Sequence, residues 1–531
     1  MTLCYSEGLS VLCVAGILPA RPAAVPAATN HSDCGGKMPP PLAGETPATQ
    51  KNRTTERPWC YSGLTRFPAP DRQSRAWVHV AAMQNIIPGC IFASMDRVRL
   101  QVALDFVELP RAMAVAEAAV AGGADYLEAG TPLIKSEGLE AVRRLRAAFP
   151  DKLIVADTKT ADAGRIEAES AAKAGANVMT VLGTASASTI RECAEAGRHY
   201  GLTVGVDLLG VADPIALARR AKELGAARLE VHCPIDAQMQ GADPLALLKQ
   251  LRGATDLTLA VAGGINSETA AAAVAAGADV IVVGGAITKA IDPQGAAADI
   301  RKAIDTGQAV ATQLFKRTAG EDIRKVLQQV RTSNISDGSH RLACLEGIRP
   351  VFPGTFACGP AVTVRTMPGD WSKPVQAIDV AGEGDIIVID AGGVGPAVWG
   401  ELATESAKNK KLSGLVVNGA VRDTGEIRKL AFPVWARLVV SHAGDPRGLG
   451  QINVPIEIAG QRICPGDWIV ADDDGVMLLP KDRAVEMANR AADVLETENR
   501  YRAEIRDNKS TLAKVLNLAR WDQKGGGPSI G

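Results

Sequence analysis

The sequence lacks an excess of either charge, is poor in aromatic residues and contains no long apolar run. Its 531 residues carry 58 Lys and Arg against 59 Asp and Glu, so no general basic excess is available to bind nucleic acid or anionic lipid. No apolar run reaches the roughly 18 residues of a membrane span, and the nearest candidate, Val280 to Ile287, is broken by glycines. The sequence therefore predicts neither a nucleic-acid partner nor a membrane partner. Its length predicts several domains.

Cysteine pairs with the spacing of a zinc site are also missing, so we predict reduced thiols and a cytoplasmic protein. The first 94 residues hold 11 of the 30 prolines and 5 of the 10 cysteines, without a sustained helical or strand period. We interpret residues 1–94 as a disordered or spurious extension. A secretion signal over Leu9 to Ala20 is disfavoured because no Lys or Arg precedes it. Met95, directly before the first well-patterned strand, is the predicted start of the folded chain.

Short β-rich runs recur from Met95 onward, with Ala-rich helical stretches between them that often end on Gly-Ala, where glycine suits a helix C-terminus. Eight such units predict a (β/α)8 barrel over residues 95–307, because an open doubly wound sheet usually stops at about five or six strands. The predicted strands are Leu100 to Leu104, Tyr126 to Ala129, Leu153 to Ala156, Val178 to Leu182, Thr203 to Val206, Arg228 to Val231, Leu257 to Val261 and Val280 to Val283.

Polar residues stand at the ends of five of these runs: Asp105, Glu128, Asp157, Asp207 and His232. Barrel active sites lie at the carboxyl ends of the strands. A single carboxylate there commonly caps the next helix, and a lone histidine is commonly structural, but several such groups on one rim predict a shared site. Further polar residues just beyond these ends are Lys159, Asp162, Asp236 and Gln238.

Glycine pairs follow the last two strands, at Gly263-Gly264 and Gly284-Gly285. Backbone N–H groups in such loops commonly bind phosphate, so we predict a phosphate-ester substrate. Clustered carboxylates without a His or Cys cluster favour Mg²⁺ over zinc. A divalent ion beside a lysine can stabilise an enediolate, and a histidine can move its proton. Together these features predict carbon–carbon bond chemistry on a sugar phosphate.

Three motifs carry a resemblance to a known family. Asp157-Thr-Lys-Thr-Ala-Asp162 matches the DxKxxD signature of the orotidine-monophosphate decarboxylase suprafamily. Gln101-Val-Ala-Leu-Asp105 and Glu128-Ala-Gly-Thr-Pro132 resemble its 3-hexulose-6-phosphate synthase branch. The resemblance runs from about Met95 to Gly307 and implies an obligate dimer.

The resemblance also implies residue roles. Glu128 and Asp157 would bind Mg²⁺ (or Mn²⁺), Lys159 would contact the enediolate, and His232 would handle protons. Asp162 would reach the site of a neighbouring subunit. Asp105 and Asp207 join the predicted catalytic set as acids of the same rim.

The implied reaction joins D-ribulose 5-phosphate and formaldehyde, or runs in reverse; the sequence does not fix the direction. The sister branch, 3-keto-L-gulonate-6-phosphate decarboxylase, shares the apparatus and is the alternative. It typically has Glu, Arg and Thr where this chain has Asp207, Ile235 and Ala262, so the resemblance favours the synthase. At Gly285 many relatives place an arginine on the phosphate, so backbone N–H groups must contribute more here.

The second half has a less regular pattern. Residues 308–330 follow helical spacing and predict a helical linker. A second domain is predicted over 331–510, closed by a helix from Asp482 to Ile505, and residues 511–531 are predicted to form a tail. The predicted strands are Ala361 to Arg365, Ile386 to Ile389, Gly414 to Val417, Ile456 to Ala459, Trp468 to Ala471 and Val476 to Leu479.

Two glycine-containing loops of this half could carry chemistry, and Arg422 and Asp423 are the last residues of the second, Asn418 to Asp423. Arginine can bind a carboxylate bidentately and an aspartate can bind Mg²⁺, which would suit a 2-oxo acid, although a surface ion pair is the alternative. The stretch from about Thr332 to Lys481 resembles the RraA-like family, which includes 4-hydroxy-4-methyl-2-oxoglutarate aldolase and the regulator of ribonuclease activity.

That second resemblance implies a β/β/α swivelling domain, usually in trimers, with Asp423 as metal ligand and Arg422 as pyruvate-binding arginine. The substrate loop would comprise Gly400, Glu401 and Leu402. Inactive family members leave a non-catalytic regulator as the alternative for this half.

Overall fold

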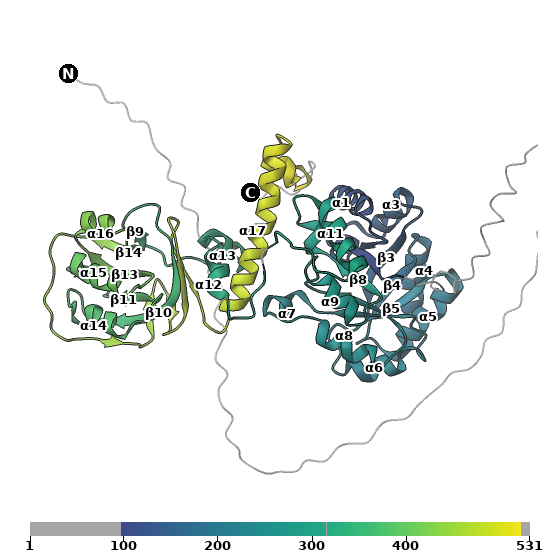
Figure 1. Cartoon of the computed structure of the whole chain (residues 1–531), viewed down its shortest axis with the longest axis horizontal. Coiled ribbons are helices and arrows are strands. Elements are labelled where there is room, and N and C mark those ends of the chain that lie inside the picture. Colours follow the sequence, from purple (N-terminus) through teal and green to yellow (C-terminus); the bar gives the residue numbers. More distant parts are fainter. Residues whose placement is uncertain (1–96, 315, 522–531) are drawn as a thin grey trace, which may run out of the picture. The chain divides into compact units, whose positions relative to one another are not determined.

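The computed structural model of the chain describes residues 97–314 and 316–521 (Figure 1). The predicted extension over residues 1–94 lies outside these ranges. None of the helices in the described part is long and apolar enough to cross a membrane.

Eight parallel strands close into a barrel in chain order, with β8 pairing back onto β1 (Figure 1). This confirms the predicted (β/α)8 architecture. Each strand was predicted to within a few residues, and β3 extends furthest beyond its prediction. The strands are β1 Arg99–Leu104, β2 Tyr126–Ala129, β3 Leu153–Thr160, β4 Val178–Leu182, β5 Thr203–Asp207, β6 Arg228–His232, β7 Thr258–Ala262 and β8 Val280–Val283.

Small side chains let the surrounding helices approach the barrel closely. Ala112, Ala116 and Ala119 on one helix are fully buried, and they lie at helical spacing on a single face. The helices are α1 Leu109–Ala121, α2 Thr131–Glu137, α3 Glu140–Ala148, α4 Gly164–Lys173, α5 Ala187–Tyr200, α6 Pro214–Ala221, α7 Ile235–Met239, α8 Leu245–Arg252, α9 Ala270–Ala275, α10 Gly285–Thr288 and α11 Pro293–Thr306.

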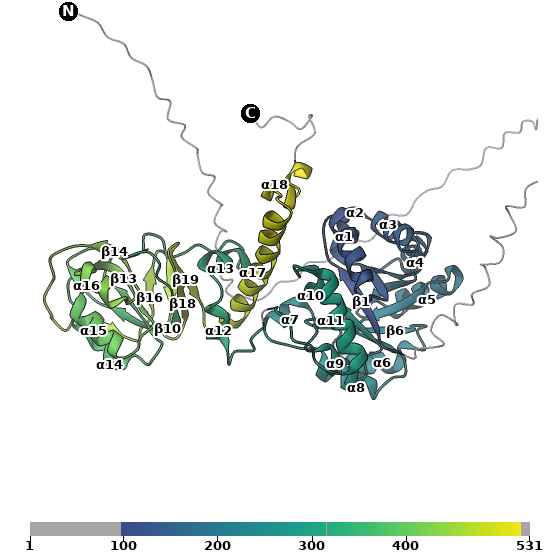
Figure 2. The ribbon, with the colours of Figure 1, turned by 45° about the horizontal axis from the view of Figure 1, so that its top comes forward.

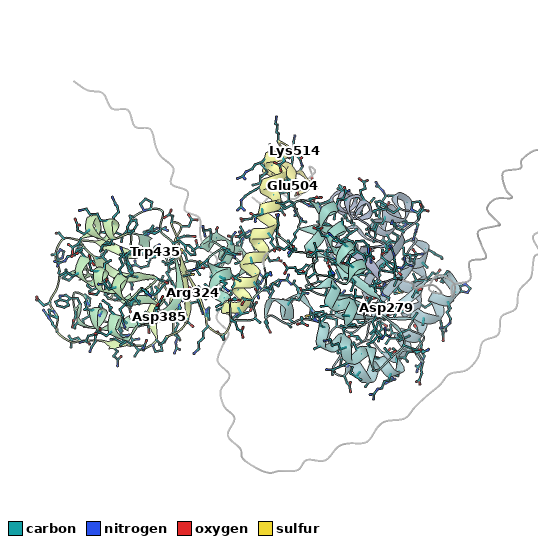
Figure 3. The ribbon with its side chains drawn as sticks, viewed as in Figure 1. Asp279, Arg324, Asp385, Trp435, Glu504 and Lys514 are labelled. Atoms are coloured by element: carbon teal, nitrogen blue, oxygen red, sulfur yellow. The ribbon has the colours of Figure 1, made fainter. Side chains whose placement is uncertain are left out.

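Asp279, labelled in Figure 3, ties the starts of two barrel strands together. Its Oδ2 accepts a hydrogen bond from Leu259 N at 2.8 Å and contacts Arg252 Nη1 at 2.9 Å. This pairing lies at the amino ends of the strands, away from the polar rim at their carboxyl ends, and therefore serves the fold.

The second domain is built on a mixed sheet with the strand order β19-β18-β10-β11-β13-β14-β9. β12 pairs with β13, β15 pairs with β10, and β16 and β17 form a separate hairpin. The bounds are β9 Arg349–Pro350, β10 Ala357–Arg365, β11 Ile386–Asp390, β12 Ala397–Trp399, β13 Gly414–Val421, β14 Val434–Val439, β15 Gln451–Ile452, β16 Ile456–Ile458, β17 Gln461–Ile463, β18 Trp468–Ala471 and β19 Val476–Leu479.

Both faces of this sheet are buried. Ile387 and Ile389 pack into one apolar cluster, whereas Ile386 and Val388 pack into another that includes Trp435 (Figure 3). Alternation along β11 produces this division. The helices of this half are α13 Thr332–Gly338, α14 Ser372–Val380, α15 Glu401–Asn409, α16 Thr424–Leu430, α17 Ala484–Asp507 (Figure 2) and α18 Leu512–Val515.

The helical linker predicted over 308–330 is wrong for most of its length, because among the residues of this range that the structure describes only α12, Ile323–Leu327, is helical. The side chain of Asn489 on α17 donates to Thr318 O and accepts from Thr318 N, both at 2.9 Å. A residue whose backbone groups are used in this way cannot supply the bonds of a continuous helix. Arg324 of α12 then donates to Cys358 O at 2.7 Å (Figure 3).

The predicted tail is also partly structured. Before residue 522 it contains α18 and the short 3₁₀ helix Leu518–Trp521. The closing helix was predicted within two residues of the observed α17 at each end.

Candidate functional site

A cavity of about 1100 Å³ opens at the carboxyl ends of the barrel strands. It brings together every predicted barrel site residue except Asp162. The predicted residues that line it are Asp105, Glu128, Asp157, Lys159, Asp207, His232, Gly263, Gly264, Gly284 and Gly285.

Four of these residues form a continuous chain of charged contacts. Lys159 Nζ lies 2.6 Å from Asp157 Oδ2 and 3.3 Å from Asp207 Oδ2. The same Asp207 oxygen lies 3.2 Å from Nδ1 of His232. β3 and β5 thus place an ammonium group between two carboxylates, and one of those carboxylates orients the imidazole ring.

Hydroxyl groups hold Asp157 in place. Thr180 Oγ1 donates to Oδ1 at 2.7 Å, and Thr131 Oγ1 donates to Oδ2 at 2.7 Å. Because each oxygen accepts from a hydroxyl group and Oδ2 also accepts from Lys159 Nζ, the carboxylate has little freedom to rotate.

A buried network below the cavity was not predicted from the sequence. Gln101 donates through Nε2 to Glu128 Oε2 at 2.5 Å and accepts through Oε1 from Arg228 Nη2 at 2.7 Å. Arg228 also binds Glu230, with Nε 2.7 Å from Oε1. The alternation Arg-x-Glu-x-His along β6 was the available signal, because it directs these side chains and His232 to one side of the strand.

The electrostatics of the cavity follow from burial and crowding. Burial, with the charges of Asp157 and Asp105, raises the pKa of Glu128 well above its usual value. Burial and Asp157 likewise raise the pKa of Asp105. Burial lowers the pKa of Lys159, but Asp157 and Asp207 outweigh this effect and raise it. Burial would raise the pKa of Asp207, yet the hydrogen bond and charge of His232 lower it.

These carboxylates fit the requirements of a hard divalent cation. Among the residues that the structure describes, no three His, Cys, Asp or Glu side chains converge into a complete metal site. Mg²⁺, however, commonly takes only one or two protein carboxylates and completes its shell with water and substrate oxygens. Glu128 and Asp157 can supply that pair. The pKa of Glu128 is raised by burial and by the charges of Asp157 and Asp105, and a cation would offset that charge repulsion.

The glycine pairs after β7 and β8 form one wall of the cavity. Gly263 and Gly264 have φ angles of 113° and 72°, which favour glycine. A Cβ at Gly263 would also lie 2.5 Å from Cys233 O. Two cations that the sequence analysis did not single out, Lys289 and Arg317, line the same region.

Asp162 does not line this cavity. Its side chain is exposed and accepts a hydrogen bond from Ala163 N at 2.7 Å. The role that the resemblance implies, in the site of a second subunit, therefore stays a prediction.

The second domain has a separate cavity of about 470 Å³, which brings together four of its five predicted residues: Glu401, Leu402, Arg422 and Asp423. Asp423 Oδ2 lies 3.4 Å from Arg422 Nε and accepts a hydrogen bond from Glu401 N at 3.2 Å. The fifth, Gly400, lies next to Asp423, and a Cβ at Gly400 would lie 2.6 Å from Asp423 Oδ2. The close approach requires glycine at this position.

Comparison with known proteins divides the chain in the same way. Residues 98–300 match the Orotidine 5'-phosphate decarboxylase / HUMPS family, and residues 332–478 match the Aldolase/RraA family. The 3-hexulose-6-phosphate synthase of Mycobacterium gastri is 41% identical over 206 residues, which cover 39% of this chain and 99% of that protein. The synthase of Methylomonas aminofaciens is 43% identical over 201 residues, 38% of this chain and 96% of that protein.

Among solved structures, 3-hexulose-6-phosphate synthase from Salmonella typhimurium is 37% identical, with a TM-score of 0.39, and the match covers 40% of this chain and 100% of that one. The family match and the two curated synthases show that the chain belongs, through its barrel, to the Orotidine 5'-phosphate decarboxylase / HUMPS family, and it carries an RraA-like domain in its second half.

Proposed function

We propose that the barrel catalyses the aldol addition of D-ribulose 5-phosphate to formaldehyde, or the reverse cleavage. The observation that carries this proposal is the contact chain Asp157–Lys159–Asp207–His232 within one cavity. It combines a base with a cation at the place where an enediolate must be formed and held. The names of the relatives support the same reaction.

In this scheme His232 removes the C1 proton of the sugar phosphate. Its Nδ1 faces Asp207, so we assign the other ring nitrogen, Nε2, to the substrate. Asp207 fixes the ring and stabilises its protonated form, while Lys159 offsets charge that develops on the substrate oxygens. The enediolate carbon then attacks the carbon of formaldehyde, and the alkoxide that forms takes up the proton that His232 removed from C1.

Glu128 and Asp157 are the residues that would hold Mg²⁺ or Mn²⁺. When bound, such an ion would polarise the substrate oxygens and so lower the energy of the enediolate. The hydroxyl groups of Thr180 and Thr131 donate to Asp157, and the amide of Gln101 donates to Glu128. These hydrogen bonds hold the two carboxylates in fixed orientations.

The decarboxylase alternative is disfavoured by three positions that all line the cavity: Asp207, Ile235 and Ala262. Ile235 supplies no charge to the cavity where the decarboxylase branch has an arginine. The direct test measures formaldehyde-dependent loss of ribulose 5-phosphate by the purified chain with Mg²⁺, and 3-keto-L-gulonate 6-phosphate serves as the competing substrate. Turnover of the keto-gulonate ester alone would replace the synthase proposal with the decarboxylase.

For the second domain we propose a 2-oxo-acid aldolase or decarboxylase site. Arg422 and Asp423 line its cavity together, which places a carboxylate-binding fork next to a possible metal ligand. Release of pyruvate from 4-hydroxy-4-methyl-2-oxoglutarate, or decarboxylation of oxaloacetate, is the assay. If neither reaction occurs with Mg²⁺ or Mn²⁺, the regulator alternative is favoured.

A further inference from the structure

Two cations border the glycine pairs of the barrel cavity. Arg317 Nη1 lies 3.5 Å from the position that a Cβ would take at Gly264. Lys289 Nζ lies 3.9 Å from the corresponding position at Gly285. The two side chains therefore face the same loops whose backbone N–H groups were predicted to meet a phosphate group.

A carboxylate from α17 already contacts both cations. Oδ1 of Asp493 forms an ion pair with Lys289 Nζ and lies 3.7 Å from Arg317 Nη2. Asp493 lines the cavity with them, and the side chains of Lys289, Asp493 and Arg317 are 23%, 28% and 31% exposed. One oxygen that contacts two cations beside the glycine loops marks a place where a negatively charged oxygen is stabilised.

The position of Arg317 is fixed by its neighbours rather than by its own backbone. Its guanidinium group donates to the side-chain oxygen of buried Gln238, whose Nε2 donates to Cys233 O at 2.7 Å. The adjacent Thr318 is held by Asn489, which is 1% exposed and also donates to Met239 O at 2.8 Å. The linker, α17 and the loop after β6 therefore meet at this point.

Arg317 and Asp493 lie outside both matched ranges, 98–300 and 332–478. They belong to the segments that join and close the two domains of this chain. We propose that Arg317 and Lys289 bind the phosphate group of the barrel's substrate, and that Asp493 neutralises both cations until the phosphate replaces it. The identity of the ester rests on the proposed function, whereas the anion site rests on the contacts above.

A phosphate site and a purely structural ion pair respond differently to mutation. Loss of Arg317 removes a phosphate ligand, whereas loss of the Asp493 charge removes a competitor for the phosphate. The two changes should therefore shift phosphate affinity in opposite directions. If the three residues only fastened α17 to the barrel, both changes would weaken the same contact, and phosphate affinity would shift in the same direction in both variants.

The test compares Arg317→Ala and Asp493→Asn in the full chain, with initial rates at varied ribulose 5-phosphate and saturating formaldehyde. For Arg317→Ala we expect KM to rise about ten- to hundredfold, as for loss of a charged hydrogen bond, with kcat within about twofold. For Asp493→Asn we expect a severalfold fall in KM. Lys325→Ala and Asp322→Asn remove an exposed ion pair in the linker and serve as charge-matched controls without effect on KM.

Calorimetric binding of inorganic phosphate provides a readout that needs no turnover. Affinity should fall in Arg317→Ala and rise in Asp493→Asn. Arg317→Gln, which keeps a polar side chain next to Gln238, replaces Arg317→Ala if that variant does not fold. Shifts in the same direction, or no shift, would overturn the inference while leaving the synthase proposal intact. Opposite shifts in phosphate binding without formaldehyde-dependent turnover would instead overturn the synthase proposal and retain the anion site.

Discussion

The buried pair Arg228–Glu230 offers the sharpest test of how the barrel supports its cavity. Arg228 is 1% exposed and Glu230 is 6% exposed. They contact through Nε–Oε1 at 2.7 Å and Nη2–Oε2 at 3.0 Å. Arg228→Met would leave the Glu230 carboxylate buried without its cation, which typically costs about 3–5 kcal/mol of unfolding free energy. It would also leave Gln101 Oε1 without its donor.

Replacing both partners should recover most of this loss. In Arg228→Met/Glu230→Met no uncompensated charge remains, and Arg228 Nη1, which has no hydrogen-bond partner in the wild type, is removed as well. The remaining cost is the unpaired Gln101 oxygen, about 1–3 kcal/mol. We therefore expect the double variant to be more stable than Arg228→Met. We also expect both variants to lose synthase activity, because Glu128 depends on Gln101 for its orientation.

Urea unfolding can be followed with two signals that separate the domains. Residues 98–307 contain no tryptophan, whereas four of the seven tryptophans lie in residues 332–478. The far-UV circular dichroism transition should move in the variants, and tryptophan fluorescence reports on the second domain. Arg143→Met removes an exposed barrel ion pair with Glu140 and should cost under about 1 kcal/mol. A loss below about 1 kcal/mol in Arg228→Met, or a double variant as unstable as the single one, would refute the reasoning.

Four further predictions concern the two sites. Burial and neighbouring acids raise the pKa of Glu128 above its usual 4.5, so the folded barrel loses stability as pH rises through that value and above. Glu128→Gln should accordingly raise the urea midpoint at pH 7 but not at pH 4, while activity is lost; an equal effect at both pH values would contradict this. Lys159→Met should lower kcat by about 10²–10³-fold without unfolding the barrel, and a near-normal kcat in a folded variant would remove Lys159 from the mechanism. EDTA should abolish formaldehyde-dependent turnover and Mg²⁺ should restore it, whereas full activity in a metal-free preparation would exclude the magnesium proposal. Asp423→Ala should abolish any 2-oxo-acid reaction and leave hexulose-phosphate synthesis nearly unchanged; loss of the synthase reaction instead would mean that the sites depend on each other.

Much of the barrel could be predicted because its information is local. The barrel strands are short apolar runs, five of which end in a polar residue, and several of the helices end near a glycine. The alternation is therefore visible without tertiary contacts. The carboxyl ends of parallel strands meet on one rim, which is why Asp105, Glu128, Asp157 and Asp207 could be assigned to one cavity before the structure was known. The short strands of the second domain, such as β9, β12 and β15, were missed because they are too short to show a period.

The order of strands and helices, the division into two domains, and the polar groups at the strand ends could all be predicted from local patterns in the sequence. The contacts that surround those polar groups could not. Arg228 supports Glu128 through Gln101, a residue 127 positions away from it in the chain, and Asp493 meets Lys289 across 204 positions. Contacts between residues so far apart in the sequence depend on how whole elements pack, so the local spacing of residues does not predict them. The linker is a further example. Its apolar residues have helical spacing, but the side chain of Asn489 hydrogen-bonds with the backbone N–H and C=O of Thr318, and no continuous helix forms there.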